Sequence, residues 1–415
     1  MSFASLGLSE FLVRALDEQG YEQPTPIQDK AIPAILNGGD VVAAAQTGSG
    51  KTAGFALPIL ETLSQRPAQG VRPLRALVLV PTRELAVQVG EAIKTYAQFL
   101  PESLKIMTVY GGVSINPQMM GLRGGCDVMI ATPGRLLDLL DNNATDLKSV
   151  ETLVLDEADR MLDLGFADEL GAILKLLPRK RQNLLFSATF PDGVKHLTQT
   201  LLVDPTEIEI KIEATIPEQV QQRAIEVDRT NRTTLLKQLI KEENWSRVIV
   251  FVASKRSANN VALKLSRVGI TATALHGDLN QAARTKALAD FKSKSFRVLV
   301  ATDLASRGID IVSLPCVVNY DLPRSPSDYV HRIGRTGRAG ESGIALSFID
   351  HESDNHFKVI EKRIKQKIPR ENIEGLERSP YAPVELLDKT GPVKGKRKSK
   401  KDKLREAAAR AQKKG

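Results

Sequence analysis

The sequence predicts two α/β domains, each with a parallel sheet flanked by helices. A chain of 415 residues is too long for a single hydrophobic core, so more than one domain is expected. Short apolar runs without polar alternation recur along the chain, and segments with helical periodicity, such as 82–96 and 257–268, lie between them. This pattern is typical of parallel strands buried on both faces. The runs form two series, at residues 40–46, 75–81, 127–133, 152–157 and 183–189, and at residues 247–254, 271–277, 297–302, 316–321 and 343–349.

Polar, proline-containing sequence marks the predicted domain boundaries. The stretch 204–222 has no helical period and separates the two series, so we place a linker at 211–220. This predicts an N-terminal domain over 1–210 and a C-terminal domain over 221–368. Beyond that point the strand signals stop and the sequence becomes rich in proline and poor in apolar residues. We therefore expect a basic, mostly disordered tail over 369–415.

Charge is distributed unevenly along the chain. The formal net charge is +9, yet residues 392–415 alone hold 11 basic and 2 acidic side chains. Residues 1–210 have a net charge of −7, and residues 211–391 have +7. The tail thus accounts for the whole excess. The two domains must bind any polyanion through individually placed residues rather than through bulk attraction.

Composition excludes several classes of protein. Hydrophobic residues make up 42% and charged residues 26% of the chain, as in ordinary globular proteins. The only cysteines are Cys126 and Cys316, so neither a disulfide framework nor a cysteine-based zinc site is expected. The N-terminus does not resemble a signal peptide, and no apolar run approaches about 18 residues. We therefore expect a cytoplasmic protein with no membrane association.

The glycine-rich segment AQTGSGKT (45–52) follows a predicted strand and precedes a predicted helix. Gly48 and Gly50 allow backbone N–H groups to turn toward a phosphate at the helix N-terminus. Lys51 can then reach the β- and γ-phosphates, and the Thr52 hydroxyl can bind Mg²⁺. Ala45 stands where the general pattern has its first glycine. The alternative interpretation is a glycine-rich turn with a surface lysine.

The run LVLDEADR (153–160) ends a predicted buried strand at the sheet edge where α/β proteins bind ligands. Beside a phosphate loop, Asp156 fits the carboxylate that holds Mg²⁺ largely through water. Glu157 fits the group that orients and deprotonates the attacking water. Alone, the run also fits an exposed acidic turn. Together the two motifs predict hydrolysis of a nucleoside triphosphate.

The segment HRIGRTGR (331–338) places three arginines and a histidine among glycines in the second domain. Arg335 and Arg338 could stabilise the transferring phosphoryl group from across a cleft between the domains. By itself the segment also fits a solvated basic loop or an RNA-binding patch.

Eight segments in order resemble the complete motif set of the DEAD-box ATP-dependent RNA helicases. They are GYEQPTPIQ (20–28), AQTGSGKT, PTRELA (81–86), TPGR (132–135), DEAD (156–159), SAT (187–189), RGID (307–310) and HRIGRTGR. The resemblance covers about residues 1–368 and is greatest to the bacterial RhlE-type subgroup. It implies two RecA-like domains, ATP and Mg²⁺ as cofactors, and RNA as the substrate.

The resemblance also implies roles for individual residues. Gln28 would recognise the adenine edge, Tyr21 would pack on the base and Phe3 would support the pocket, which makes residues 1–29 a Q motif. The ATP-binding set would be completed by Ala45, Gln46, Thr47, Gly48, Ser49, Gly50, Lys51, Thr52 and Asp310. Coupling to domain closure would involve Ser187, Thr189, Asp159 and His331. RNA phosphates and sugars would contact Thr82, Arg83, Gly112, Thr132, Arg135, His276, Gly277, Gln281, Arg284, Thr302 and Arg307.

Aromatic residues make up only 5% of the chain, so base stacking is not expected to be the main mode of RNA binding. Contacts to the RNA backbone would make binding independent of sequence. We therefore expect an ATP-gated clamp that closes on one strand, pries short duplexes apart and is reset by hydrolysis. Two alternatives stay open: an RNA clamp or scaffold with little unwinding, and a DNA translocase.

The expected setting is ribosome assembly or RNA turnover, with ribosomal precursor or RNA-decay proteins as candidate partners of a monomeric enzyme. The tail KGKRKSKKDKLREAAARAQKK fits either an RNA anchor or a solvated end without a binding role.

Overall fold

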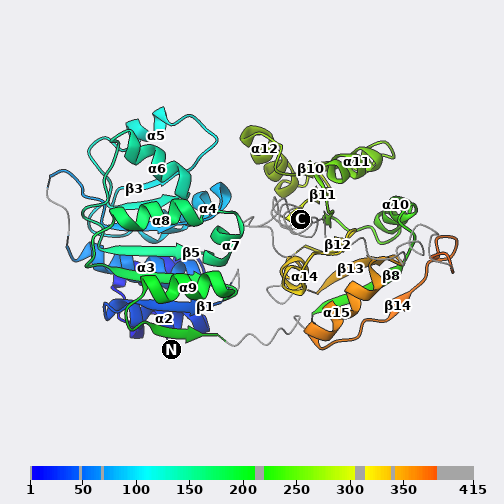
Figure 1. The fold of residues 1–415 in the computed structure, drawn as a ribbon, viewed down its shortest axis with the longest axis horizontal. Helices are drawn as coiled ribbons and strands as arrows, with labels where there is room; N and C mark the ends of the chain where they lie inside the picture. The colour runs from blue at the N-terminus through cyan, green and yellow to red at the C-terminus, as the bar shows by residue number, and fades with distance from the viewer. Residues whose placement is uncertain are drawn as a thin grey trace, which may run out of the picture.

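The computed structural model describes residues 2–45, 49–66, 70–210, 219–303, 314–337 and 342–380. It contains two seven-stranded sheets, seen as two lobes in Figure 1. Every strand pair within them is parallel. The predicted fold class is therefore confirmed.

The first sheet has the strand order β3-β4-β2-β5-β6-β1-β7. Its strands are β1 (Val41–Ala44), β2 (Ala76–Leu79), β3 (Ile106–Val109), β4 (Val128–Ala131), β5 (Thr152–Asp156), β6 (Gln182–Ser187) and β7 (Thr206–Glu209). The helices of this half are η1 (Ala4–Leu6), α1 (Glu10–Glu18), α2 (Pro26–Leu36), α3 (Lys51–Ser64), α4 (Arg83–Tyr96), α5 (Asn116–Gly121), α6 (Pro133–Asp141), α7 (Ala158–Asp163), α8 (Ala167–Leu176) and α9 (Asp192–Leu201).

The second sheet has the order β10-β11-β9-β12-β13-β8-β14, which repeats that of the first strand for strand. Its strands are β8 (Val220–Glu226), β9 (Val248–Phe251), β10 (Ala272–Leu275), β11 (Val298–Ala301), β12 (Cys316–Asn319), β13 (Gly343–Ile349) and β14 (Arg370–Glu371). The helices are α10 (Arg232–Glu242), α11 (Lys255–Ser266), α12 (Gln281–Lys292), α14 (Pro326–Ile333) and α15 (Asp354–Ile364).

Helices cover both faces of each sheet, which explains why the strands lack polar alternation. In β1, for example, Val41 and Ala43 pack in the core under α1 to α4, whereas Val42 packs in the core under α6 to α9. In the second domain, α10 and α11 cover one face, and α12, α14 and α15 cover the other. A strand buried on both faces needs apolar side chains at every position.

Polar caps begin several helices at the carboxyl edge of the sheets. The hydroxyl of Thr82 accepts from Leu85 N at 3.3 Å, and the Asn280 Oδ1 accepts from Ala283 N at 2.8 Å. Such caps satisfy backbone N–H groups of the first turn that have no partner within the helix. The helix predicted at 82–96 is confirmed, and the one predicted at 257–268 begins two residues earlier, at Lys255.

The structure differs from the prediction where strands are polar or short. β7 lies within the stretch 204–222 that we interpreted as a boundary, and β8 begins inside that stretch, at Val220. Three of the four residues of β7 are exposed, so this edge strand gives little apolar signal. Residues 211–218, most of the proposed linker, lie outside the described residues.

The predicted start of the tail at 369 also needs correction. β14 pairs with β8, and Ile373 and Leu376 pack against the core of the second sheet. The side chain of Arg378 binds Glu226 at 2.8 Å. Residues 370–380 thus join the second domain through a short strand, two apolar contacts and an ion pair, features that a composition count does not detect. Residues 381–415 lie outside the described residues.

Within the described part of the chain, no helix is long and apolar enough to span a bilayer.

Candidate active site and nucleic-acid interface

The carboxyl ends of three neighbouring strands meet at one edge of the first sheet. β1 ends before Ala45, β5 ends at Asp156 and β6 ends at Ser187. The N–H of Ala45 donates to the Ser187 carbonyl at 3.0 Å, which ties the start of the glycine-rich loop to the end of β6. The sequence motifs are thereby brought together, as expected for parallel strands. Gln46, Thr47 and Gly48 of the loop lie outside the described residues.

Lys51 and Asp156 form the buried centre of this edge. Gly50 precedes α3 with φ +91°, a left-handed conformation that glycine adopts without strain, so the helix begins at Lys51. Lys51 Nζ lies 3.9 Å from Asp156 Oδ1. Both atoms are buried, and neither makes a hydrogen bond to any residue that the structure describes. Burial of two charged atoms so incompletely paired is expensive unless a ligand completes them.

The ionisation of Asp156 reflects this environment. The pKa of Asp156 is raised from 3.8 to about 6, mainly by burial and also by the charge of Glu157, while Lys51 opposes the shift. A nearby cation would favour the charged form of this carboxylate and so lower its pKa.

The residues here fit a Mg²⁺ ion that arrives with a nucleotide. Asp156 offers an unpaired carboxylate oxygen, and Thr52, the second residue of α3, offers a hydroxyl. Among the described residues there is no group of three or more metal-binding side chains.

Glu157 is held in a fixed position beside Asp156. Its backbone has φ +56°, and its side chain is buried. Its Oε2 accepts from Arg160 Nη1 at 2.8 Å. Sequence reasoning did not single out Arg160, although an arginine three residues after a helix-starting glutamate is a common ion-pair spacing.

Asp159, Ser187 and Thr189 form one hydrogen-bonded group. Asp159 Oδ2 accepts from Thr189 Oγ1 at 2.7 Å and from Thr189 N at 3.0 Å. The N–H of Asp159 donates to Ser187 Oγ at 3.2 Å, and Ser187 Oγ donates to the Thr189 carbonyl at 2.7 Å. The structure thus joins three of the four predicted coupling residues. His331, the fourth, lies in α14 of the second domain.

Gln28 connects the N-terminal segment to the glycine-rich loop. Its Nε2 donates to the Gly50 carbonyl at 3.1 Å, and its Oε1 accepts from Thr25 N at 2.9 Å in a capping box at the start of α2. Tyr21 is 39% exposed, and its hydroxyl lies 3.4 Å from that of Tyr96. Phe3 is buried in the hydrophobic core of the first domain.

A cleft between the two domains collects most of the residues predicted to bind RNA. It has a volume of about 460 Å³. Its lining includes Thr82, Arg83, Thr132 and Arg135 from the first domain and Gly277, Gln281 and Arg284 from the second. Helices α4, α6 and α12 all begin at this cleft, with Arg83, Pro133 and Gln281 as their first residues. Helix N-termini and arginine side chains favour phosphate groups.

Glu84 bridges the domains inside this cleft, and sequence reasoning did not predict it. Its Oε1 lies 2.5 Å from Arg284 Nε and 3.5 Å from Gln281 Nε2. The neighbouring Arg83 donates from Nη1 to Gln281 Oε1 at 3.1 Å. The starts of α4 and α12, which face each other in Figure 1, are thus joined directly. The position of Glu84 next to Arg83 was the only signal in the sequence.

The remaining predicted RNA-binding residues lie around the cleft or outside the described chain. His276 is buried, with Nε2 3.0 Å from Asn259 Oδ1, and Thr302 donates its N–H to Leu275 O at 3.2 Å. Gly112 has φ +76° and lies against the guanidinium of Arg83, where a Cβ would collide with it. Arg307, Asp310 and Arg338 lie outside the described residues, whereas Arg335 follows α14.

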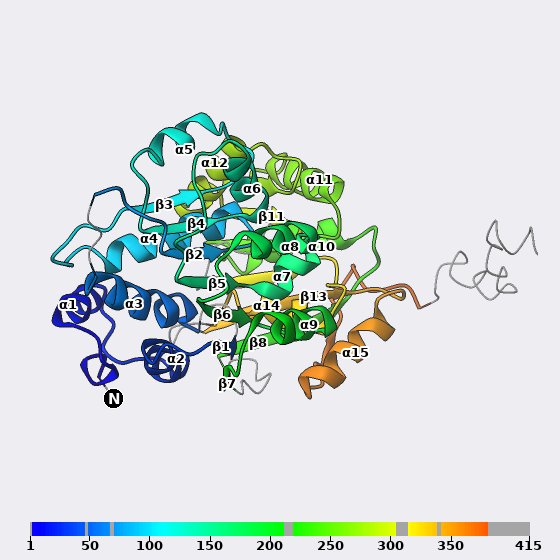
Figure 2. The ribbon, with the colours of Figure 1, turned by 60° about the vertical axis from the view of Figure 1, so that its left-hand side comes forward.

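The fold and the two sites define a protein of tandem RecA-like domains with a nucleotide-type site at the edge of the first sheet. Family models match both halves: DEAD/DEAH box helicase over residues 25–197 and helicase conserved C-terminal domain over residues 231–340. Figure 2 shows the two matched halves from a second side.

Individual proteins of the same family are also similar to this chain in sequence and structure. The DEAD-box ATP-dependent RNA helicase CshA of Bacillus cereus is 40% identical over 89% of this chain and 69% of its own length. The helicase DeaD of Mycobacterium tuberculosis is 42% identical over 88% and 64%. Saccharomyces cerevisiae Dbp5 bound to RNA and ADP BeF3 is 31% identical, with a TM-score of 0.79 over 89% of this chain and 95% of that one. The chain belongs to the DEAD-box ATP-dependent RNA helicase family.

We expect the contact between Glu84 and Arg284 to couple the domains even without RNA. Their side chains are only 15% and 12% exposed, so screening by solvent is limited. A double-mutant cycle with Glu84→Gln and Arg284→Gln should give a coupling of about 0.5–1 kcal/mol in thermal unfolding of the RNA-free protein. Glu91→Gln, on the exposed face of α4, should give none with Arg284→Gln. Additive effects at Glu84 and Arg284 would contradict the contact.

Proposed function

We propose that the chain hydrolyses ATP when RNA occupies the cleft between its domains, and that closure of the domains locally unwinds short RNA duplexes. The observation that carries this proposal is the cleft itself, whose helix N-termini and arginines come from both domains. A backbone bound across both halves is sensitive to their relative position. Conversely, closing the domains changes the shape of the bound strand.

ATP binds at the carboxyl edge of the first sheet in this proposal. The loop 45–50, with Lys51, holds the triphosphate, and Gln28 recognises the adenine edge with Tyr21 packed on the base. Thr52 and Asp156 hold Mg²⁺, Asp156 largely through water. When bound, Mg²⁺ supplies positive charge that neutralises the phosphate oxygens. Asp310 completes the ribose contact from the second domain.

Glu157 orients and deprotonates the attacking water. Arg335 and Arg338 supply positive charge to the transferring phosphoryl group when the second domain closes on the first. Asp159, Ser187, Thr189 and His331 transmit the state of the nucleotide site to the cleft. The hydrogen-bonded group formed by Asp159, Ser187 and Thr189 supports this role, because Asp159 is two residues from Glu157.

The Glu157→Gln variant should lose RNA-stimulated ATP hydrolysis by about 10²-fold or more, because glutamine cannot accept the proton of the attacking water. Binding of ATP and RNA should persist, measured by fluorescence titration. Glu151→Gln is the matched control, since Glu151 precedes the same strand and pairs with Arg66 on the surface. Wild-type turnover in Glu157→Gln would show that another group acts as the base.

Unwinding distinguishes the proposal from an RNA clamp or scaffold with little helicase activity. A short RNA duplex should be displaced with ATP and at most weakly with a non-hydrolysable analogue, under conditions of repeated turnover. ATP hydrolysis without displacement would favour the scaffold. Stimulation of the ATPase by DNA equal to that by RNA would favour a DNA translocase. The proposal predicts stronger stimulation by RNA than by DNA, because a protein distinguishes the two through contacts to the 2′-hydroxyl groups.

The basic tail acts as an RNA anchor that does not read sequence. Residues 392–415 carry a net charge of +9, which is sufficient to neutralise several phosphates. Deleting them should raise the RNA concentration for half-maximal ATPase and flatten its dependence on salt, because fewer counterions are released on binding. The maximal rate should be unchanged. An unaltered RNA requirement at both low and high salt would identify the tail as an inert end.

Ribosome assembly and RNA turnover are the settings we propose for this activity. Ribosomal precursor and RNA-decay proteins are the corresponding partners of a monomeric, cytoplasmic enzyme. Crosslinking the protein to RNA in cells and sequencing the bound RNA would decide between these settings.

A further inference from the structure

The second sheet contains a counterpart of the nucleotide site. Both sheets have the same strand order, so β8 occupies the place of β1, and β12 and β13 occupy the places of β5 and β6. The helix after β1 begins at Lys51, and the helix after β8 begins at Arg232. Each of these basic residues is buried at the carboxyl edge of its sheet.

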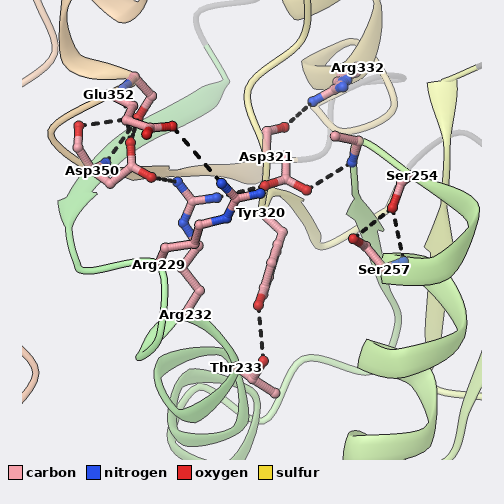
Figure 3. Close-up of polar contacts among 12 residues, drawn as sticks. Arg229, Arg232, Thr233, Ser254, Ser257, Tyr320, Asp321, Arg332, Asp350 and Glu352 are labelled. Atoms are coloured by element: carbon pink, nitrogen blue, oxygen red, sulfur yellow. Dashed lines mark hydrogen bonds and ion pairs between the residues drawn. The ribbon is translucent and has the colours of Figure 1, made fainter. Parts of the chain in front are cut away.

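The two basic residues are paired very differently. Lys51 Nζ is 3.9 Å from Asp156 and has no hydrogen-bond partner among the described residues. Arg232 donates from Nη1 to Asp321 Oδ1 and from Nη2 to Asp350 Oδ2, both at 2.6 Å. Figure 3 shows its guanidinium between the two carboxylates. The connection before α10, VDRTN, has no glycine and therefore no phosphate loop.

The carboxylates around Arg232 belong to loops that the second domain must hold in place. Burial acts to raise the pKa of Asp350, but hydrogen bonds from Ser353 and the charge of Arg232 lower it overall. Asp321 Oδ2 also accepts from Ala253 N at 2.8 Å. The two hydrogen bonds of Arg232 thus connect the end of β12, through Asp321, to the end of β13, through Asp350. Asp321 also connects them to the turn after β9.

The same loop contacts Arg332 of α14, the helix that leads into Arg335. The Asp321 carbonyl accepts from Arg332 Nη1 at 2.7 Å, and Asn319 Oδ1 accepts from the same atom at 3.0 Å. Arg332 also binds Asp303, with Nε 2.6 Å from Oδ1 and Nη2 2.7 Å from Oδ2. Arg332 follows His331 and precedes Arg335 by three residues, and the Arg335 N–H donates to the Arg332 carbonyl at 3.1 Å.

We propose that Arg232 is a positioning residue for ATP hydrolysis: at the place that Lys51 has in the first domain, it pairs with Asp321 and Asp350 and so holds the loop after β12 in the shape that orients Arg332 and Arg335. The inference depends on the proposed role of Arg335 at the phosphoryl group. Arg232 makes short hydrogen bonds to two carboxylates, whereas Lys51 and Asp156 are only incompletely paired. The edge of the second sheet is therefore rigid rather than ligand-binding.

The test separates turnover from binding. Arg232→Met should lower kcat for RNA-stimulated ATP hydrolysis about 10-fold, because the two carboxylates lose their shared partner and the loop after β12 shifts. Arg232→Lys, which can keep a single ion pair, should lie between Met and the wild type. The Kd for ATP without RNA should change less than twofold for both, since the first domain holds most of that site.

A matched control accounts for lost stability. Arg223→Met removes another arginine of the second domain, which pairs with Glu371 and Glu243 rather than with the loop after β12. Measured well below both melting temperatures, Arg223→Met should leave kcat within twofold of the wild type. A wild-type kcat in Arg232→Met, or an equal loss in Arg223→Met, would overturn the proposal.

Two further outcomes are decisive. If Arg232→Met does not fold, Arg232→Lys decides, and a kcat within twofold of the wild type for this variant rejects the positioning role. Arg335→Ala tests the proposed function separately. If Arg335→Ala lowers kcat and the Arg232 variants do not, only the present inference fails. If Arg335→Ala retains the wild-type kcat, the proposed role of Arg335 itself is wrong.

Discussion

Parallel pairing of every strand is the constraint on which both sites depend. Because all strands of a sheet run in one direction, their carboxyl ends and the loops that follow them gather at one edge. Residues far apart in the sequence, such as Ala45, Asp156 and Ser187, therefore become neighbours without any long loop. The backbone bond between Ala45 and Ser187 is a direct result of this pairing. The second domain repeats the arrangement, which places Arg232, Asp321 and Asp350 together in the same way.

The two domains use the same edge for different purposes. In the first, charged groups are left incompletely paired, as a ligand site requires. In the second, Arg232 donates to two carboxylates, and the loop after β12 that holds one of them contacts Arg332 of α14. The contact between Glu84 and Arg284 adds a direct connection across the cleft. The edges of the two sheets, helix α14 and the cleft between the domains are thus parts of one scaffold.

Much of the scaffold could be predicted from the sequence because buried parallel strands are apolar at every position and their motifs have fixed spacing. The prediction was weakest where apolar signal is absent. β7 and β8 are edge or polar strands, and the segment 370–380 is held by β14 and by the ion pair of Arg378 with Glu226. Contacts between side chains that are far apart in the sequence could not be predicted from it either. Nothing in the pattern around Glu84 indicated a partner about 200 residues away, and nothing around Arg232 indicated partners 89 and 118 residues away.

The incomplete pairing of Lys51 and Asp156 makes the stability of the first domain depend on pH. Because burial raises the pKa of Asp156 from 3.8 to about 6, the native state binds a proton more tightly than the unfolded chain. The stability this proton gives is present below pH 3.8 and is lost as the pH rises through about 6. At neutral pH the charged site is therefore a local weakness in the fold. Any ligand that completes this pair binds the native state in preference to the unfolded chain, and so stabilises the first domain.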